Sequence, residues 1–141
     1  MYSRIIFVAD QPYSERNAQR YGFDRWESKG ISPEFWDFSP FLQKDYAQSH
    51  VHNSFSDSRN RKFSTESGAI EVIELLDKDC ILVWLLYGIG FKHRKIISAI
   101  ERNAGTWGGW RTNLLPLTTS DARNKSIALA LSKPGRFAKK A

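Results

Sequence analysis

Apolar runs and helical periods alternate along the first half of the chain. The β-branched run Arg4–Ala9 (RIIFVA) predicts a first buried strand. Pro12 breaks this run, and a helical face between residues 14 and 30 predicts a helix that Gly30 ends. Residues 34–38 predict a second, short strand. A strand, a helix and a strand within about 38 residues have the length of a parallel βαβ unit.

The second half repeats this alternation after a long polar segment. Residues 43–64 scatter a few aromatic residues among Ser, Asn, Asp, Arg and Lys, and we interpret them as a loop. One apolar face over residues 69–76 predicts a helix. The continuously apolar run 80–86 (CILVWLL) predicts a strand that is covered on both faces, at the centre of a parallel sheet.

Three further elements follow that strand. Residues 93–103 predict a helix, and the alternation calls for a fourth strand within residues 106–117, although two adjacent glycines disfavour it. A last helix is expected over residues 120–131. Together these elements predict an α/β class protein, a Rossmann-like three-layer domain whose small, mainly parallel sheet has three to four or more strands, with a basic C-terminal helix and tail.

Charge divides the chain into two predicted parts. Residues 1–119 carry 15 Lys and Arg against 14 Asp and Glu, whereas residues 120–141 carry six against one. We therefore expect a Rossmann-like domain over 1–119 and a basic helix and tail over 120–141, the latter a candidate linker to a second domain. Because the body is balanced, a nucleic-acid partner is not expected from its net charge.

The single cysteine and the length of the apolar segments predict where in the cell the protein is located. The single cysteine, Cys80, falls inside an apolar run and is expected to be buried, which fits a reducing compartment. The N-terminal apolar stretch is too short for a signal peptide, and none is long enough for a membrane span. These observations predict a cytoplasmic protein without a transmembrane segment.

Candidate ligand contacts follow from the fold class, because an open parallel sheet binds ligands beyond the carboxyl ends of its strands. The loops expected there, with two tryptophans near the last strand, supply the candidate ligand-binding residues Gln11, Tyr13, Ser14, Arg16, Asp37, Tyr87, Gly88, Gly90, Lys92, His93, Trp107 and Trp110. The first loop, ADQPYSER, lacks the glycines of a dinucleotide fingerprint, so no cofactor is expected on this domain.

Each of these features also has a simpler interpretation. Ser14 suits a helix N-cap. Lys92 and His93 at a helix start fit either a solvated face or an anion site. Trp107 and Trp110 suit either packing at the sheet edge or an aromatic platform for a sugar or a base. No metal site is predicted, because His50 and His52 have no third ligand nearby in the sequence.

The order of these pieces resembles the N-terminal domain of GT-B type glycosyltransferase-like proteins of bacterial surface polysaccharide synthesis. The matching segments follow the opening strand and end before residue 118: PYSERNAQRYG, GISPEFWDFSPFL, ISAIERN and NLLP. The resemblance implies a domain that faces a sugar or lipid-linked acceptor, while a second domain would hold the nucleotide sugar. It carries over no catalytic residue and implies inactivity of this domain alone.

Two other classes of function remain open from the residues. One is a non-enzymatic, flavodoxin-like or receiver-like module that binds a protein partner. A receiver needs an acidic pocket, for which only Asp10 and Asp37 qualify. The other is nucleic-acid binding by the basic tail and the aromatic residues. An unfinished sheet edge would also favour a homo-oligomer.

Overall fold

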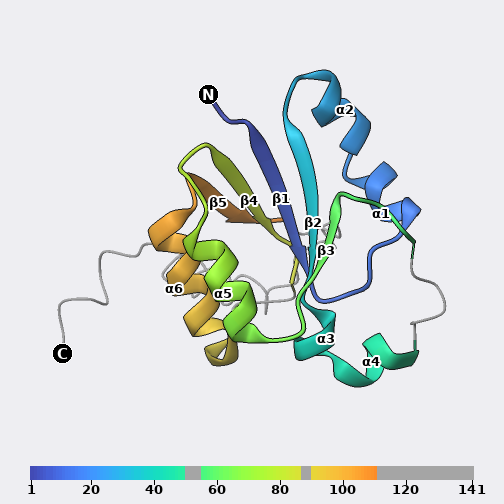
Figure 1. Cartoon of the computed structure of the whole chain (residues 1–141), viewed down its shortest axis with the longest axis vertical. Coiled ribbons are helices and arrows are strands. Elements are labelled where there is room, and N and C mark those ends of the chain that lie inside the picture. Colours follow the sequence, from blue (N-terminus) through green and yellow to red (C-terminus); the bar gives the residue numbers. More distant parts are fainter. Residues whose placement is uncertain (50–54, 87–89, 111–141) are drawn as a thin grey trace, which may run out of the picture. The chain divides into compact units, whose positions relative to one another are not determined.

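The computed structural model describes residues 1–49, 55–86 and 90–110, which form an α/β domain around a five-stranded, fully parallel sheet (Figure 1). The strands are β1 (Arg4–Ala9), β2 (Ser32–Asp37), β3 (Asn60–Lys62), β4 (Cys80–Trp84) and β5 (Thr106–Gly109). Their order, β3-β2-β1-β4-β5, is that of the Rossmann fold. The predicted fold class is therefore confirmed, and the 2-1-3-4-5 order of flavodoxin-like and receiver-like domains is not found.

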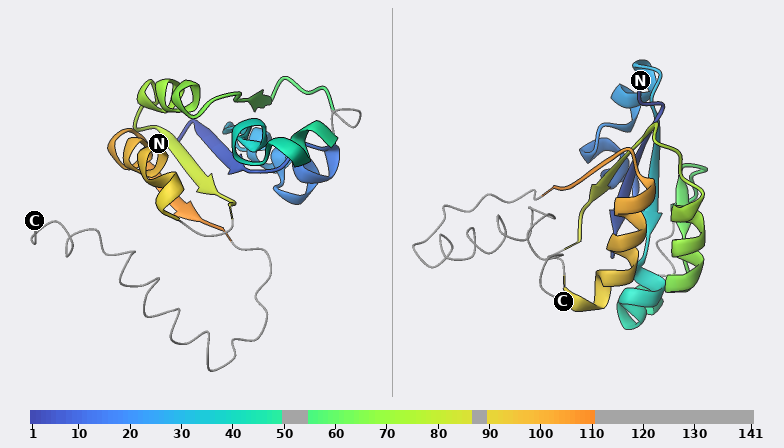
Figure 2. Two further views of the ribbon diagram at one scale, coloured as in Figure 1. Left: turned by 90° about the horizontal axis from the view of Figure 1, so that it is seen from below. Right: turned by 90° about the vertical axis from the view of Figure 1, so that its left-hand side faces the viewer.

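Helices cover both faces of the sheet (Figure 2). The helices α1 (Glu15–Arg20) and α2 (Phe23–Ser28) lie on one face, and α5 (Glu66–Glu74) and α6 (Arg94–Asn103) lie on the other. Two short helices, α3 (Ser39–Leu42) and α4 (Lys44–Ser49), lie beyond the carboxyl end of β2. This arrangement gives the predicted three layers, with α3 and α4 added at the edge where ligands bind in such folds.

Strand alternation divides the apolar core between the two faces. In β1, Ile6 and Val8 pack toward α5 and α6, whereas Ile5 and Phe7 pack toward α1 and α2. All four side chains are buried, as a strand between two parallel neighbours requires. The central strand is thus β1, with β4 beside it. Cys80, at the start of β4, is buried as predicted.

The predicted single helix between residues 14 and 30 is instead two short helices. The chain leaves α1 at Tyr21, and Gly22 adopts a φ of 68°, a left-handed conformation that interrupts a helix. The predicted end at Gly30 is confirmed. Its φ is 74°, and the N–H of Ile31 donates to the carbonyl of Trp26 at 3.0 Å, which closes a Schellman motif.

The interpretation of residues 43–64 as a loop is wrong for two stretches, α4 and β3. All three residues of β3 are polar or charged, so no apolar pattern indicates a strand there. Long-range pairing forms it: the N–H of Phe35 donates to the carbonyl of Arg59 at 2.8 Å, and the N–H of Phe63 donates to that of Asp37 at 3.0 Å. The predicted last strand is β5, which includes Gly108 and Gly109.

Some sequence predictions fall outside the described residues, namely the helix over 120–131 with its tail, Tyr87, Gly88, His50 and His52. Across the three described ranges, no helix combines the length and the apolar character needed to cross a membrane.

Candidate functional site

A cavity of about 300 Å³ lies at the carboxyl edge of β2 and β3. Of the predicted ligand-binding residues, Tyr13 and Asp37 line it, and they come from the loop after β1 and from the end of β2. The remaining wall comes from α3, α4, the first loop and the β3 region: Pro12, Ser39, Pro40, Lys44, Ala47, Gln48, Phe55, Asn60 and Lys62. We call this cavity the edge pocket.

Asp37 is the buried acid of the edge pocket, with 1% of its surface exposed. Its Oδ1 accepts a hydrogen bond from the N–H of Ser39 at 2.8 Å, and Lys62 is its register partner on β3. Burial raises the pKa of Asp37, while Ser39 and then Lys62 oppose the shift and Asp10 adds to it. The hydrogen bond from the N–H of Ser39 therefore positions the carboxyl group, and neighbouring charges change its pKa.

Two buried polar atoms of the edge pocket have no hydrogen-bond partner within the described part of the chain. They are Ser39 Oγ and Asn60 Oδ1. Ser39 is fully buried, and it lies close enough to Asp37 to lower that group's pKa, yet its hydroxyl makes no hydrogen bond of acceptable geometry. Buried polar atoms almost always have a hydrogen-bond partner. Two such atoms without one, in residues that line the same cavity, indicate groups that a ligand or a water molecule can pair with.

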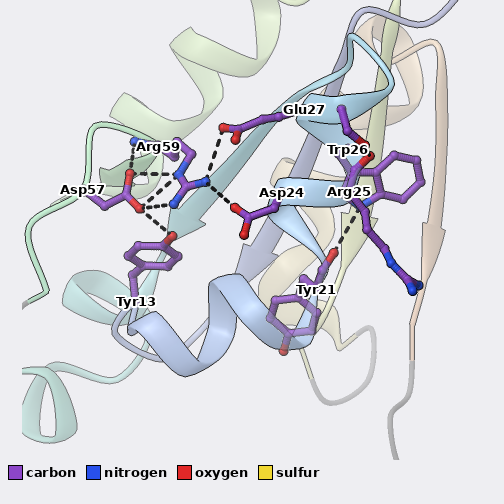
Figure 3. Close-up of polar contacts among 9 residues, drawn as sticks. Tyr13, Tyr21, Asp24, Arg25, Trp26, Glu27, Asp57 and Arg59 are labelled. Atoms are coloured by element: carbon purple, nitrogen blue, oxygen red, sulfur yellow. Dashed lines mark hydrogen bonds and ion pairs between the residues drawn. The ribbon is translucent and has the colours of Figure 1, made fainter.

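Tyr13 forms the apolar wall of the edge pocket and is held by an ionic cluster behind it (Figure 3). Its ring packs on Phe35 with a centroid distance of 4.9 Å, and its hydroxyl donates to Asp57 Oδ2 at 2.9 Å. Arg59 Nη2 contacts the same Asp57 oxygen at 2.7 Å. Burial, followed by the hydrogen bond to Asp57, raises the pKa of Tyr13 well above its ordinary value.

The other residues of the first loop are placed away from the edge pocket lining. Ser14 is the N-cap of α1, as its simpler interpretation predicted, and its Oγ accepts from the N–H of Asn17 at 3.3 Å. Gln11 and Arg16 are exposed. Ligand binding by Ser14, Gln11 and Arg16 stays a prediction.

The residues after β4 form a separate group. His93 is buried against Trp84, with ring centroids 5.6 Å apart, and its Nδ1 accepts from the N–H of Gly90 at 3.2 Å. Burial, with a smaller contribution from Lys92, lowers the pKa of His93. Lys92 itself is exposed beside α6. His93 is therefore a neutral, packed group at neutral pH, and its role in a ligand site stays untested.

Trp107 and Trp110 lie on opposite faces of the sheet. Trp107 packs against the core under α5 and α6, whereas Trp110 lies 6.3 Å from the ring of Phe7 and 5.7 Å from that of Tyr21, on the α1 and α2 side. The two rings therefore do not form one platform. The reason is geometric, since residues three apart in an extended chain point to opposite sides.

The lining residues that sequence reasoning missed include three that supply polar groups: Lys44, Asn60 and Lys62. All three lie in the segment interpreted as a loop. Phe63, a single buried aromatic residue just before the helix cap Thr65, is the one local signal that an ordered strand precedes it.

Comparisons of the chain with protein-family models, with curated proteins and with solved structures found no match. The resemblance to glycosyltransferase-like proteins thus stays a prediction.

Proposed function

We propose that this domain binds a small hydroxyl-bearing ligand of the sugar class in the edge pocket, as the acceptor-side domain of a glycosyltransferase-like protein. The observation that carries the proposal is the buried Ser39, a lining residue whose Oγ has no hydrogen-bond partner among the described residues. An unsatisfied hydroxyl costs about 1–3 kcal/mol, so a ligand that pairs with it gains that free energy on binding.

The lining of the edge pocket suits hydroxyl groups. Asp37 supplies a carboxylate acceptor, Ser39 a hydroxyl, and Asn60 an amide oxygen, all within one cavity. Its volume of about 300 Å³ is at the lower end of the range typical of ligand pockets. Phe55, which is 38% exposed and lies 5.7 Å from the ring of Tyr13, adds apolar ring surface on which the C–H face of a sugar packs.

The charge at the mouth of the edge pocket favours an acidic ligand. Lys44 on α4 and Lys62 on β3 both line it, and Asp37 is the one acid among the lining residues. Two ammonium groups against one carboxyl group leave an excess of positive charge in the lining. We therefore expect sugars that carry a carboxylate or phosphate to bind more tightly than neutral sugars.

The acceptor role follows from the sequence resemblance combined with the position of the pocket. A pocket at the carboxyl edge of a Rossmann-like sheet is where such domains hold their ligands. In this proposal the domain binds and orients the acceptor, and a second domain supplies the activated sugar. The domain alone is then a binding module without turnover.

Ligand titration followed by amide chemical-shift changes tests the proposal. The ligands are glucose, glucuronate and glucose 6-phosphate, added to isotope-labelled protein. We expect saturable shifts at residues of the edge pocket, tighter binding of the two acidic sugars, and roughly tenfold weaker binding by Ser39→Ala, because one paired buried group is lost.

Matched variants separate the pocket from general surface effects. Lys62→Ala should reduce the preference for acidic sugars, whereas Lys95→Ala, an equal loss of charge at an exposed position of α6, should leave binding unchanged. Shifts that do not saturate, or that map to other parts of the domain, would overturn the proposal. Turnover of a nucleotide sugar by the 141-residue chain would contradict the binding-only role.

A further inference from the structure

A second cavity of about 300 Å³ lies on the α1 and α2 side of the domain, apart from the edge pocket. Its lining combines three rings with three cations. The residues are Tyr21, Trp26 and Trp110, with Arg20, Arg25 and Lys29, and Gly22 completes the wall. We call this cavity the aromatic-basic pocket.

Helix α2 separates its charges between two sides (Figure 3). Glu27 and Asp24 point toward Arg59, with their oxygens 3.2 Å and 3.7 Å from Nη1. Arg25 points the other way, past Trp26. Arg25 and Lys29, one turn apart, both line the aromatic-basic pocket. The acids of α2 are thus occupied elsewhere and do not neutralise these cations.

The three cations of the aromatic-basic pocket are exposed and have no ion-pair partner in the portion of the chain that the structure describes. Of the six other arginines in the described ranges, Arg4, Arg59 and Arg102 each pair with an acid. Positive charge gathered without internal compensation favours an anionic partner.

The rings of the pocket offer flat surface. Trp110 is 44% exposed, and its ring meets Tyr21 edge-on at 5.7 Å, so its position is fixed by packing. Trp26 is also held, because its Nε1 donates to the carbonyl of Tyr21 at 3.0 Å. Since that donor is already used, the indole of Trp26 contributes ring surface to a ligand and no polar contact.

We propose that the aromatic-basic pocket binds one nucleotide of a single-stranded nucleic acid, with the base on Trp110 and the phosphates at Arg25, Lys29 and Arg20. Aromatic surface for bases beside cations for the backbone is the combination that single-strand binding uses. A polymer is favoured over a free nucleotide because the chain beyond Trp110, residues 111–141, holds seven Lys and Arg against one Asp.

This proposal revises the expectation drawn from net charge. Residues 1–119 are nearly neutral as a sum, and that sum led us to expect no nucleic-acid partner. The structure distributes the charges unevenly, so that α2 turns its acids to Arg59 and its cations to the ring cluster. A phosphate backbone interacts with the charge of the local surface that it contacts, and not with the net charge of the whole domain.

Fluorescence anisotropy of the full chain with labelled 12-nucleotide oligo(dT) and oligo(U) tests the proposal. The double variant Arg25→Ala/Lys29→Ala should weaken binding and reduce the slope of log affinity against log salt by about 1.4, since each single-strand phosphate contact contributes about 0.7. Trp110→Ala should weaken binding about tenfold through lost stacking, and Trp110→Phe should retain most of it.

Two comparisons make the outcome decisive. Arg94→Ala/Lys95→Ala removes equal charge from α6 on the opposite face and should change the affinity less than twofold. Heparin, a polyanion without bases, should not respond to Trp110→Ala. Unchanged oligonucleotide affinity in Arg25→Ala/Lys29→Ala would overturn the proposal. Equal sensitivity of heparin and oligonucleotide to Trp110→Ala would overturn base stacking.

Discussion

Tyr13 and Asp57 are 44 residues apart in the chain, and the tyrosine hydroxyl donates to Asp57 Oδ2 at 2.9 Å. The contact joins the loop after β1 to the segment that precedes β3. Arg59 holds the same carboxylate and reaches across to Glu27 of α2. One hydrogen-bonded cluster therefore fixes Tyr13, the apolar wall of the edge pocket, to the strand that supplies Asn60 and Lys62.

Removal of this hydroxyl should lower stability in a measurable way. We expect Tyr13→Phe to reduce the free energy of unfolding by about 1 kcal/mol, because Asp57 loses one donor while Arg59 still satisfies it. Urea denaturation measures the change. Tyr2→Phe is the matched control, since Tyr2 is exposed and makes its hydrogen bond with Thr106 at the surface. Equal losses in the two variants would contradict the special role of Tyr13.

Asp57 should make the domain sensitive to acid. The hydrogen bond from Arg59, with smaller help from Tyr13, lowers its pKa from 3.8 to about 2. A depressed pKa means that the unfolded state binds the proton first, so this contribution to stability is lost as the pH falls from about 4 toward 2. Unfolding measured over that range should show a weaker pH dependence for Asp57→Asn, whereas Asp45→Asn on exposed α4 should follow the wild type.

His93 should act in a different pH range. Its pKa is lowered by burial and by Lys92, so the unfolded chain takes up the proton as the pH falls through 6.5 while the folded state resists. The free energy of unfolding should therefore fall from pH 7 to pH 5, and it should fall less in His93→Gln. His50 and His52 are present in both proteins, so the difference isolates His93. Identical slopes would exclude this role.

Two glycines near β5 should differ sharply on substitution. A Cβ at Gly105 would lie 1.8 Å from the carbonyl oxygen of Lys78. This oxygen belongs to the backbone, so it cannot move aside by a side-chain rotation. A Cβ at Gly108 would meet nothing within 4 Å among the described residues. We expect Gly105→Ala to destabilise the domain by at least about 2 kcal/mol and Gly108→Ala to change stability by less than about 0.5 kcal/mol.

Thermal or urea unfolding of these two variants provides the measurement. Each variant adds one methyl group, and the two positions are three residues apart, so the two proteins have the same composition. Similar stability of the two proteins would show that the segment shifts freely away from Lys78 and is not fixed by that close approach.

The sequence determined the elements whose cause is local. The run Arg4–Ala9 became β1 with the predicted bounds, and Cys80–Trp84 became β4 within its apolar run, because strands buried on both faces are apolar throughout. Gly30 ended a helix because a left-handed residue closes it well. Ser14 was likewise predicted from a local signal, since a serine just before a helical face suits an N-cap.

Only the tertiary structure decided the parts that rest on distant partners. The polar strand β3 exists because β2 offers it an unpaired edge, and its pairing brings Lys62 and Asn60 to Asp37. Likewise, the spacing of residues along α2 separates its acids from Arg25, but only the fold brings Arg59 to those acids and Trp110 to the cations. The local hydrophobic pattern predicts which residues are buried, but it does not predict which distant residues become their hydrogen-bond or ion-pair partners. Both proposed sites depend on those long-range partners.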